Sequence, residues 1–277
     1  GDARQLKKQL DDLHSLPAHC CFVNYLRCHD DIGWGLDEEY GRTIGMDPAA
    51  HKKYLYEFFE GSFPGSFARG ERYNYNPATQ DARTCGTTAS LCGIEKGLYE
   101  EDEGQVALGI RRDLMMHAAV MCMAGFPMLS SGDEIGQLNG YGYHDDPTLR
   151  EDSRNLHRTP FNWDAAARRT APGTVQQRIW AGLRQLEKLR AGQPCFGPGA
   201  WVTTWDAHNN SVLAIVRRTG DETMACLFNF SGRTQTVWLD GLEGEFTDLI
   251  SGETACCPSG TLEPYQYRLC LGGTSGR

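Results

Sequence analysis

The chain has 277 residues, of which 40% are hydrophobic, and its 6 Trp, 11 Tyr and 11 Phe supply the core material that disordered chains lack. Its net charge of -9 at pH 7 would repel a polyanion over most of the surface, so we expect no nucleic-acid partner. No apolar run approaches the roughly 18 residues that span a bilayer, and no signal peptide is visible, so we expect no membrane partner.

The 11 cysteines are odd in number and show no C-x-x-C pair. Two of their pairs are adjacent, at Cys20–Cys21 and Cys256–Cys257, and neighbouring cysteines make a poor disulfide framework. We therefore predict buried, reduced thiols, which favour a cytoplasmic location. No cluster of residues implies a metal or a cofactor.

The first half of the chain alternates predicted helices and strands. Leucines at helical spacing predict a helix over residues 4–16, and the apolar run over residues 20–28 predicts a strand that is buried on both faces, as in a parallel sheet. Residues 32–104 are rich in Gly, aromatic and charged residues and contain one predicted helix, over 48–59. So long an excursion is usually functional.

The alternation then continues. Apolar residues on one stripe predict a helix over residues 105–124, and Gly125 fits its C-cap. A short buried strand is expected over 126–130, followed by a polar loop. Thr174 and Gln177 resemble a capping box, which predicts a helix that ends near Arg190.

Beyond Pro194 the pattern changes to short alternating runs separated by turns, which is typical of an antiparallel β-sandwich. The predicted strands are 201–205, 212–218, 224–230, 236–239, 245–249 and 265–271. The chain is thus predicted to be an α/β protein, with part of a (β/α) barrel before the sandwich. In such barrels the chemistry lies at the carboxyl ends of the strands.

One candidate site follows the first predicted strand, at His29-Asp30-Asp31. Carboxylates stabilise the oxocarbenium-like transition state of glycoside cleavage, and an imidazole can donate hydrogen bonds to sugar hydroxyls. The alternative is that Asp30 and Asp31 only cap the next element.

Four further groups have two interpretations each. Asp81-Ala-Arg83 and Asp152-Ser-Arg154 could clamp a carboxylate or several hydroxyls, or could be solvated surface pairs. Gly132-Asp133-Glu134 could be a site or a structural turn. The aromatic residues Tyr141, Tyr143 and His144 could form a sugar-stacking wall or could pack locally.

The sequence NYLRCHDDIGW at 24–34 resembles the fourth signature region of the α-amylase superfamily, glycoside hydrolase family 13, and its HDDIGW extension resembles the amylosucrases in particular. The resemblance continues in the same order over almost the whole chain and is weakest in the last part. It is carried by GSFARGERYNYNPATQDARTCGTTASL (65–91), GFPMLSSGDEIGQLN (125–139) and DDPTLREDSRNLHRTPFNW (145–163).

The resemblance implies a role for each matching residue. Asp30 corresponds to the catalytic carboxylate that stabilises the transition state, and His29 to the histidine that donates to the transferred ring. Asp31 and Arg83 correspond to amylosucrase positions around the neighbouring subsite. Arg154 corresponds to an arginine that pairs with an aspartate from the other half of the barrel and closes the pocket floor.

The resemblance also implies a domain organisation. Residues 1–190 would be the C-terminal portion of a TIM-type (β/α)8 barrel, about strands 7–8, with 32–104 as a subdomain inserted after strand 7. Residues 191–277 would form the C-terminal β-sandwich domain. The nucleophilic aspartate of the family, in a G-x-R-x-D pattern, and its general-acid glutamate follow earlier strands and are expected to lie outside this sequence.

The activity that the resemblance implies is retaining transfer of glucose from sucrose to an α-1,4-glucan. The partners would be sucrose and α-glucan oligosaccharides, together with a missing N-terminal part of the same protein, without which we expect these 277 residues to be inactive. One alternative is a sucrose hydrolase or another glycosidase of the α-amylase family. The other is a non-catalytic carbohydrate-binding protein built on an incomplete barrel.

Overall fold

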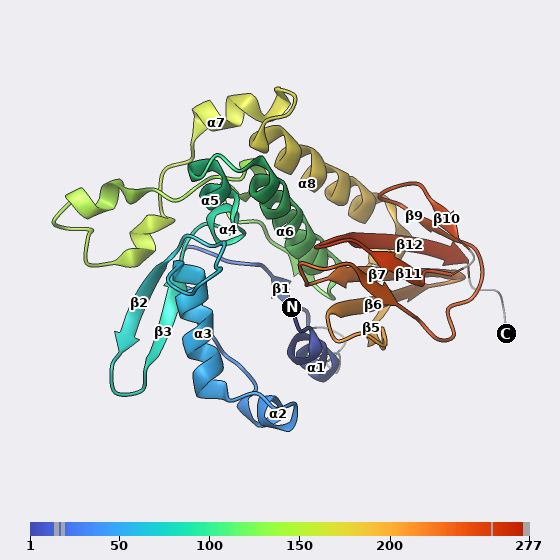
Figure 1. Cartoon of the computed structure of the whole chain (residues 1–277). Helices are drawn as coiled ribbons and strands as arrows, with labels where there is room; N and C mark the ends of the chain where they lie inside the picture. Colours follow the sequence, from blue (N-terminus) through green and yellow to red (C-terminus); the bar gives the residue numbers. More distant parts are fainter. Residues whose placement is uncertain (14–16, 18–19, 256, 274–277) are drawn as a thin grey trace. The chain divides into compact units, whose positions relative to one another are not determined.

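The computed structural model describes residues 1–13, 17, 20–255 and 257–273 (Figure 1). Its contacts divide the chain into two compact units. The first comprises residues 1–24, 115–128 and 184–277, and the second comprises residues 25–114 and 129–183. The linear domain boundary after residue 190 stays a prediction.

The first unit contains a six-stranded sheet in which every neighbouring pair is antiparallel, drawn in orange to red in Figure 1. Its strand order is β10-β9-β12-β7-β6-β5. In chain order the strands are β5 (Trp201–Trp205), β6 (Val212–Thr219), β7 (Glu222–Asn229), β9 (Phe246–Asp248), β10 (Thr254–Ala255) and β12 (Tyr267–Gly273). The antiparallel C-terminal sheet domain predicted from the alternating runs is confirmed.

A second, two-stranded antiparallel sheet pairs β8 (Gln235–Val237) with β11 (Gly260–Leu262). Apolar side chains from both sheets form one buried cluster, which includes Val216, Leu227, Val237 and Leu262. The sequence analysis missed β10 and β11, because segments of two and three residues are too short to show an alternating pattern.

The first unit also holds helix α1 (Arg4–Leu13) and a short parallel pair formed by β1 (Val23–Asn24) and β4 (Phe126–Pro127). Residues 14–16 of the first predicted helix lie outside the described residues. The strands predicted over 20–28 and 126–130 are both too long, since only two residues of each pair with the other. Ladder hydrogen bonds define a strand, and an apolar run alone does not.

Helix α6 (Glu103–Cys122) precedes β4 and agrees with the predicted helix over 105–124. Its last six residues, from His117 to Cys122, are all buried, so this end of the helix is buried on every side and the single predicted stripe is wrong there. Gly125 follows with φ +114, and a Cβ there would lie 2.4 Å from the backbone oxygen of Phe22. Glycine is therefore required at this position.

The second unit begins with helices α2 (Glu38–Thr43) and α3 (Pro48–Glu60), followed by an antiparallel hairpin of β2 (Glu71–Asn76) and β3 (Asp81–Cys85). The helix predicted over 48–59 is confirmed. Asp47 caps it by accepting from the backbone N–H groups of Ala49 and Ala50, and Pro48 occupies its first turn. The hairpin was not predicted.

The rest of this unit is built from short helices, from the first part of α6 and from the first part of α8 (Val175–Gly192). Thr174 Oγ1 accepts from the Gln177 backbone N–H at 3.1 Å, which confirms the predicted start of that helix. The short helices are α4 (Thr88–Leu91), α5 (Ile94–Tyr99), η1 (Asp133–Ile135), η2 (Tyr141–Asp145), η3 (Ser153–Leu156), α7 (Trp163–Ala167) and η4 (Arg168–Thr170). In the first unit, η5 (Pro194–Phe196) follows α8.

Five of the described cysteines are buried, and burial raises the pKa of the thiols of Cys85 and Cys270 to about 12. Cys20 and Cys21 are exposed, against the expectation of buried thiols. Among the described helices, none combines the length and the apolar character that a membrane span requires. The cytoplasmic location stays a prediction.

Candidate functional site

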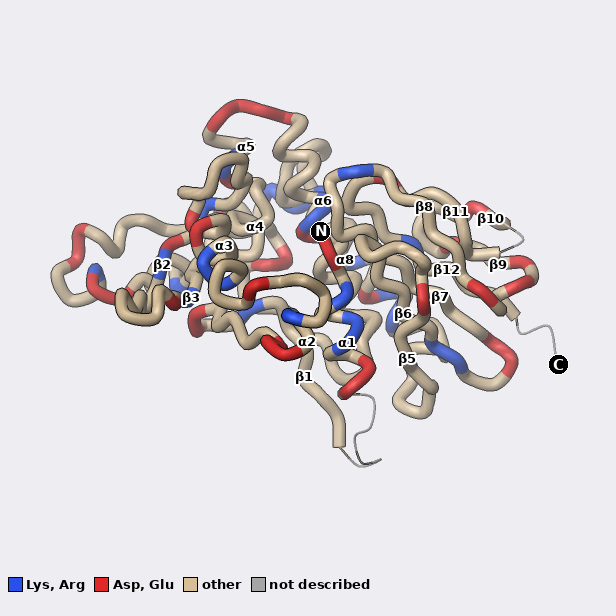
Figure 2. Tube along the Cα trace, turned by 60° about the horizontal axis from the view of Figure 1, so that its bottom comes forward, with Lys and Arg blue, Asp and Glu red and all other residues tan. Residues whose placement is uncertain are grey.

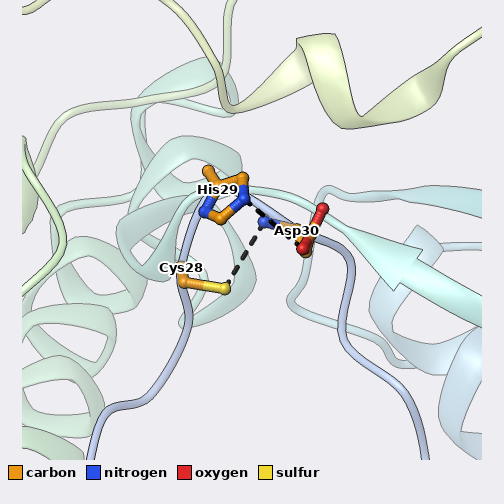
Figure 3. Close-up of side chains that lie close together, drawn as sticks. All are labelled: Cys28, His29 and Asp30. Carbon is orange, nitrogen blue, oxygen red and sulfur yellow. Dashed lines mark hydrogen bonds and ion pairs between the residues drawn. The ribbon is translucent and has the colours of Figure 1, made fainter.

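The candidate site lies in the second unit, where the chain leaves β1 and carries Cys28, His29 and Asp30 in succession (Figure 3). The Asp30 backbone N–H points to Cys28 Sγ, 3.4 Å away, and His29 Nε2 lies 3.4 Å from Asp30 Oδ2. The His29 side chain is 78% exposed and that of Asp30 is 50% exposed. Both can therefore be reached by a ligand.

Two arginines hold the Asp30 carboxylate. Arg154 Nη1 lies 3.3 Å and Arg158 Nη2 3.1 Å from the same oxygen, Asp30 Oδ1. Both arginine side chains are less than a third exposed, so solvent screens this ion pair less than it screens a fully exposed pair. The Asp30 carboxylate is thus held in a fixed position, with Oδ2 on the side of His29.

Arg154 is itself fixed by Asp152, which caps η3. Arg154 Nε lies 2.8 Å from Asp152 Oδ1, and Arg154 Nη2 lies 2.8 Å from Asp152 Oδ2. This is the bidentate geometry that favours arginine over lysine. Hydrogen bonds from Arg154 hold the pKa of Asp152 below its usual range and raise the pKa of Arg154. The guanidinium also lies 4.8 Å from the ring centre of Tyr73.

Asp31 turns towards the hairpin. Arg83 Nη1, on β3, lies 3.0 Å from Asp31 Oδ2, and the Asp31 side chain is only 6% exposed. The backbones of Ile32 and Thr84 bridge in the antiparallel sense next to this pair. The segment after Asp30 therefore runs along β3, and this alignment brings Asp31 to Arg83.

All five residues singled out in the sequence thus lie in one unit, linked through direct contacts as His29–Asp30–Arg154 and Asp31–Arg83. Their catalytic and substrate-binding roles stay predictions.

The sequence analysis missed Arg158 and His157. Arg158 Nε donates to the His29 backbone oxygen at 2.7 Å, in addition to its contact with Asp30. His157 Nδ1 accepts from the Gly86 backbone N–H at 3.2 Å, which leaves Nε2 as the donor to the His29 oxygen at 3.1 Å. Both residues lie within the stretch 145–163 that carries the resemblance, but no residue pattern indicated a role for either of them.

Three of the other candidate residues make no direct contact with the site around Asp30. Asp81 lines a cavity of about 670 Å³ between α2, α3 and the tip of the β2–β3 hairpin. Asp133 is buried and accepts from the Ser130 backbone N–H at 3.1 Å, and Glu134 accepts from that of Gly132 at 2.8 Å. Gly132-Asp133-Glu134 is therefore a structural turn.

The three aromatic candidates are engaged with glutamates of their own unit. Tyr143 is buried, its hydroxyl contacts Glu71, and His144 Nε2 lies 2.9 Å from the same carboxylate. Tyr141 donates to Glu95 at 2.7 Å. These contacts support the local-packing interpretation.

The pattern G-x-R-x-D, expected to lie outside the sequence, does occur once, at Gly109–Asp113. These residues lie within α6, and Asp113 is completely buried. A nucleophile must meet its substrate at the end of a strand, so this occurrence is not the family's nucleophilic aspartate.

One donor atom from each of Cys28, His29 and Asp30 lies within 4.8 Å of the others, a spacing that could in principle hold a metal ion (Figure 3). The guanidiniums of Arg154 and Arg158 already neutralise Asp30. A cation at the same carboxylate would be repelled by both. The charge distribution therefore disfavours a metal here.

A family model described as the C-terminal domain of maltogenic amylase matches residues 202–269, from β5 to β12. A glucosylglycerate phosphorylase from Allomeiothermus silvanus is 27% identical over 160 residues, which are 57% of this chain and 26% of that enzyme.

The segment from β5 to β12 is thus similar to the C-terminal domain of maltogenic amylase.

Solved structures of the protein AmyP share the fold. The complex with maltotriose has a TM-score of 0.51 and 21% identity, covering 60% of this chain and 35% of AmyP. The complex with maltose has a TM-score of 0.50 and 20% identity, covering 61% and 36%. The chain therefore spans about a quarter of the length of the phosphorylase, at 26%, and about a third of AmyP, at 35%.

Proposed function

We propose that the site around Asp30 is part of the active site of a retaining α-glucoside-processing enzyme of the amylosucrase type. The reaction is transfer of glucose from sucrose to an α-1,4-glucan. The observation that carries the proposal is the Asp30 carboxylate, held by Arg154 and Arg158 at 3.3 and 3.1 Å while half of its side chain stays open to a ligand.

In this proposal Asp30 stabilises the positive charge that develops at the anomeric carbon. The carboxylate must be correctly directed for that task, and the two guanidiniums hold it in one position. His29, beside it, donates to hydroxyls of the transferred ring. Asp31 and Arg83 bind the leaving fructose and then the acceptor.

A retaining mechanism also needs a nucleophile and a general acid about 5 Å apart. We propose that both come from polypeptide outside these 277 residues, which completes the (β/α)8 barrel with β1 and β4 as two of its parallel strands. On this proposal the chain alone does not turn over sucrose.

To test this proposal, the complete protein is incubated with sucrose and glycogen, and fructose release and polymer growth are measured. Asp30→Asn should lower turnover about 100-fold or more, because the charge that opposes the developing cation is removed. Asp164→Asn, at an exposed aspartate in the first turn of α7, is the matched control. Absence of fructose release by the complete protein would overturn the proposal, as would full activity of Asp30→Asn. Free glucose without polymer growth would indicate a hydrolase instead.

Phosphorolysis is a second candidate, favoured by the 27% identity to a glucosylglycerate phosphorylase. Adding inorganic phosphate to the same assay separates the two reactions, since a phosphorylase would yield glucose 1-phosphate and would not extend glycogen. If sucrose and glycogen bind without any turnover, the protein is a non-catalytic carbohydrate-binding member of the family.

A further inference from the structure

The first unit carries a set of aromatic and polar side chains that the proposed active site does not use. They lie on β5, on β6 and on the segments that follow β5 and β8. We call this set the tryptophan platform; it comprises Trp201, Trp205, His208, Arg218, Trp238 and Asp240.

Two tryptophans of the platform flank one arginine. Trp201 and Trp205 are four residues apart on β5, at the edge of the six-stranded sheet, so they project from the same face. Arg218 lies opposite Trp201 in the register, and its guanidinium carbon is 5.5 Å from the Trp201 ring centre and 5.3 Å from that of Trp205. The guanidinium thus joins the two indoles into one surface by cation–π contact.

Asp240 joins the third tryptophan to this surface. Its backbone oxygen accepts from Trp205 Nε1 at 2.9 Å, and its Oδ1 accepts from Trp238 Nε1 at 2.6 Å. His208 Nε2 lies 2.9 Å from Asp240 Oδ2, and this hydrogen bond raises the pKa of His208 and lowers that of Asp240. Trp205 and Trp238 are therefore held in place by hydrogen bonds at their edges, and Trp201 by its contact with Arg218.

Two of the three tryptophans are open to solvent, whereas Trp205 is partly buried and packs against the core of the sheet domain. The exposed fraction is 51% for Trp201 and 58% for Trp238, which is high for large aromatic residues. Within residues 1–13, 17, 20–255 and 257–273, Arg218 forms no ion pair, and its Nε is buried without a hydrogen-bond partner. A rigid aromatic surface beside a cation that lacks a carboxylate partner is prepared to contact a ligand.

The chemistry of the platform selects the class of ligand. A dry protein interface would remove water from Arg218, His208 and Asp240 without replacing their hydrogen bonds, which is costly. A polyanion would be repelled by Asp240 and by the acidic chain as a whole. A neutral sugar ring avoids both the loss of hydrogen bonds and the charge repulsion. Its C–H face stacks on an indole, and its hydroxyls donate to and accept from the polar groups at the rim.

We propose that the tryptophan platform is a carbohydrate-binding site that holds a chain of α-glucan. The choice of a neutral saccharide rests on the platform alone, whereas the choice of an α-glucan rests on the proposed function. The platform would keep a polymer bound to the protein without taking part in bond cleavage.

The test is affinity electrophoresis of the purified 277-residue chain in native gels that contain glycogen, dextran or hydroxyethylcellulose. Glycogen should retard the chain, and Trp201→Ala and Trp238→Ala should each raise the dissociation constant about tenfold by removing one stacking face. Trp201→Phe should retain part of the binding. Trp163→Ala, at a tryptophan that is 77% exposed in the other compact unit, is the matched control and should bind normally.

Equal retardation of the parent chain and both platform variants would overturn the inference, as would no retardation by any polysaccharide. If Asp30→Asn abolishes the retardation while Trp201→Ala does not, glycogen binds at the Asp30 site; the platform is then refuted and the proposed function is not. Retardation by hydroxyethylcellulose but not by glycogen would refute the proposal that the ligand is an α-glucan. Sedimentation of the chain without polysaccharide measures self-association. If the tryptophans only mediate self-association, the proposed carbohydrate-binding site is also refuted.

Discussion

His157 connects two backbone segments of the candidate site through one neutral imidazole. Its Nδ1 accepts from Gly86 and its Nε2 donates to His29, so protonation would break the first bond. Burial, together with the nearby Arg27 and Arg158 charges, lowers the pKa of His157 to about 4, although the His29 oxygen and the Asp31 charge oppose the shift. The neutral form is therefore the one that the fold requires.

This pKa predicts a specific loss of stability in acid. The unfolded chain binds a proton near pH 6.5 and the folded chain only near pH 4, so the contribution of His157 is present above pH 6.5 and is lost as the pH falls from 6.5 to 4. His157→Gln should remove this part of the pH dependence, because an amide can keep both hydrogen bonds but does not titrate. Urea denaturation of both proteins from pH 7 to pH 4 measures the difference. Parallel curves would show that His157 does not titrate in this way.

Among single residues, the sequence indicated a functional role only where the residue matched a position of a known family motif. Such motifs indicated the five candidate residues that the structure brings into one unit: His29, Asp30, Asp31, Arg83 and Arg154. Arg158 was missed because an arginine that holds a backbone oxygen resembles any surface arginine in sequence. Its partner, the His29 carbonyl, is defined only by the fold.

At the element scale, Gly70 lies where three segments of the second unit converge. A Cβ at this position would lie 2.6 Å from the Cys85 oxygen, 2.7 Å from the Phe59 oxygen and 2.8 Å from a Leu91 methyl group. Gly70 thus permits close contact between the end of α3, the end of β3 and α4. Two of these neighbours are backbone atoms, which cannot move aside without shifting the elements themselves.

We therefore expect Gly70→Ala to lower the free energy of unfolding by about 1–3 kcal/mol through overpacking. Gly35→Ala is the matched control, because a Cβ there meets nothing within 4 Å and an alanine restricts the unfolded chain. Urea denaturation of the two variants provides the measurement. A Gly70→Ala protein as stable as Gly35→Ala would mean that the three elements are packed less closely than the structure indicates.

The elements that were predicted well are those whose signals are local. Asp47-Pro48 marks the start of α3, Thr174 marks that of α8, and β5 begins and ends where the alternating pattern does. The β2–β3 hairpin was missed because its turn residues, around Pro77, carry no Asn-Gly or Asp-Gly signal. The apolar run over 20–28 gave too long a strand, since a parallel strand depends on a distant partner.

At the scale of the whole molecule, the β1–β4 pair presents an uncovered apolar strip. Val23 and Phe126 are direct partners in the register and are 55% and 63% exposed, and Met128, on the same face as Phe126, is 40% exposed. Parallel strands are normally covered on both faces. Within the described part of the chain, each of these two strands pairs only with the other. Such a strip favours association.

Phe126→Thr should therefore weaken the self-association of the isolated chain, with a dissociation constant that rises about tenfold because a large apolar side chain is removed from the contact. Sedimentation velocity over a concentration series measures it. Leu149→Thr, at a residue that is 41% exposed in the other compact unit, is the matched control. An effect of the same size in both variants, or a monomeric parent chain, would contradict the prediction.

The same substitution distinguishes the isolated chain from the proposed complete barrel. If further strands cover the strip, Phe126→Thr becomes a change in a buried core and should lower the free energy of unfolding of the complete protein by about 3 kcal/mol. In the isolated chain, where the side chain is exposed, the cost should be close to zero. Equal and small effects on both proteins would mean that the strip stays uncovered, and β1 and β4 would then not be interior strands of a closed barrel.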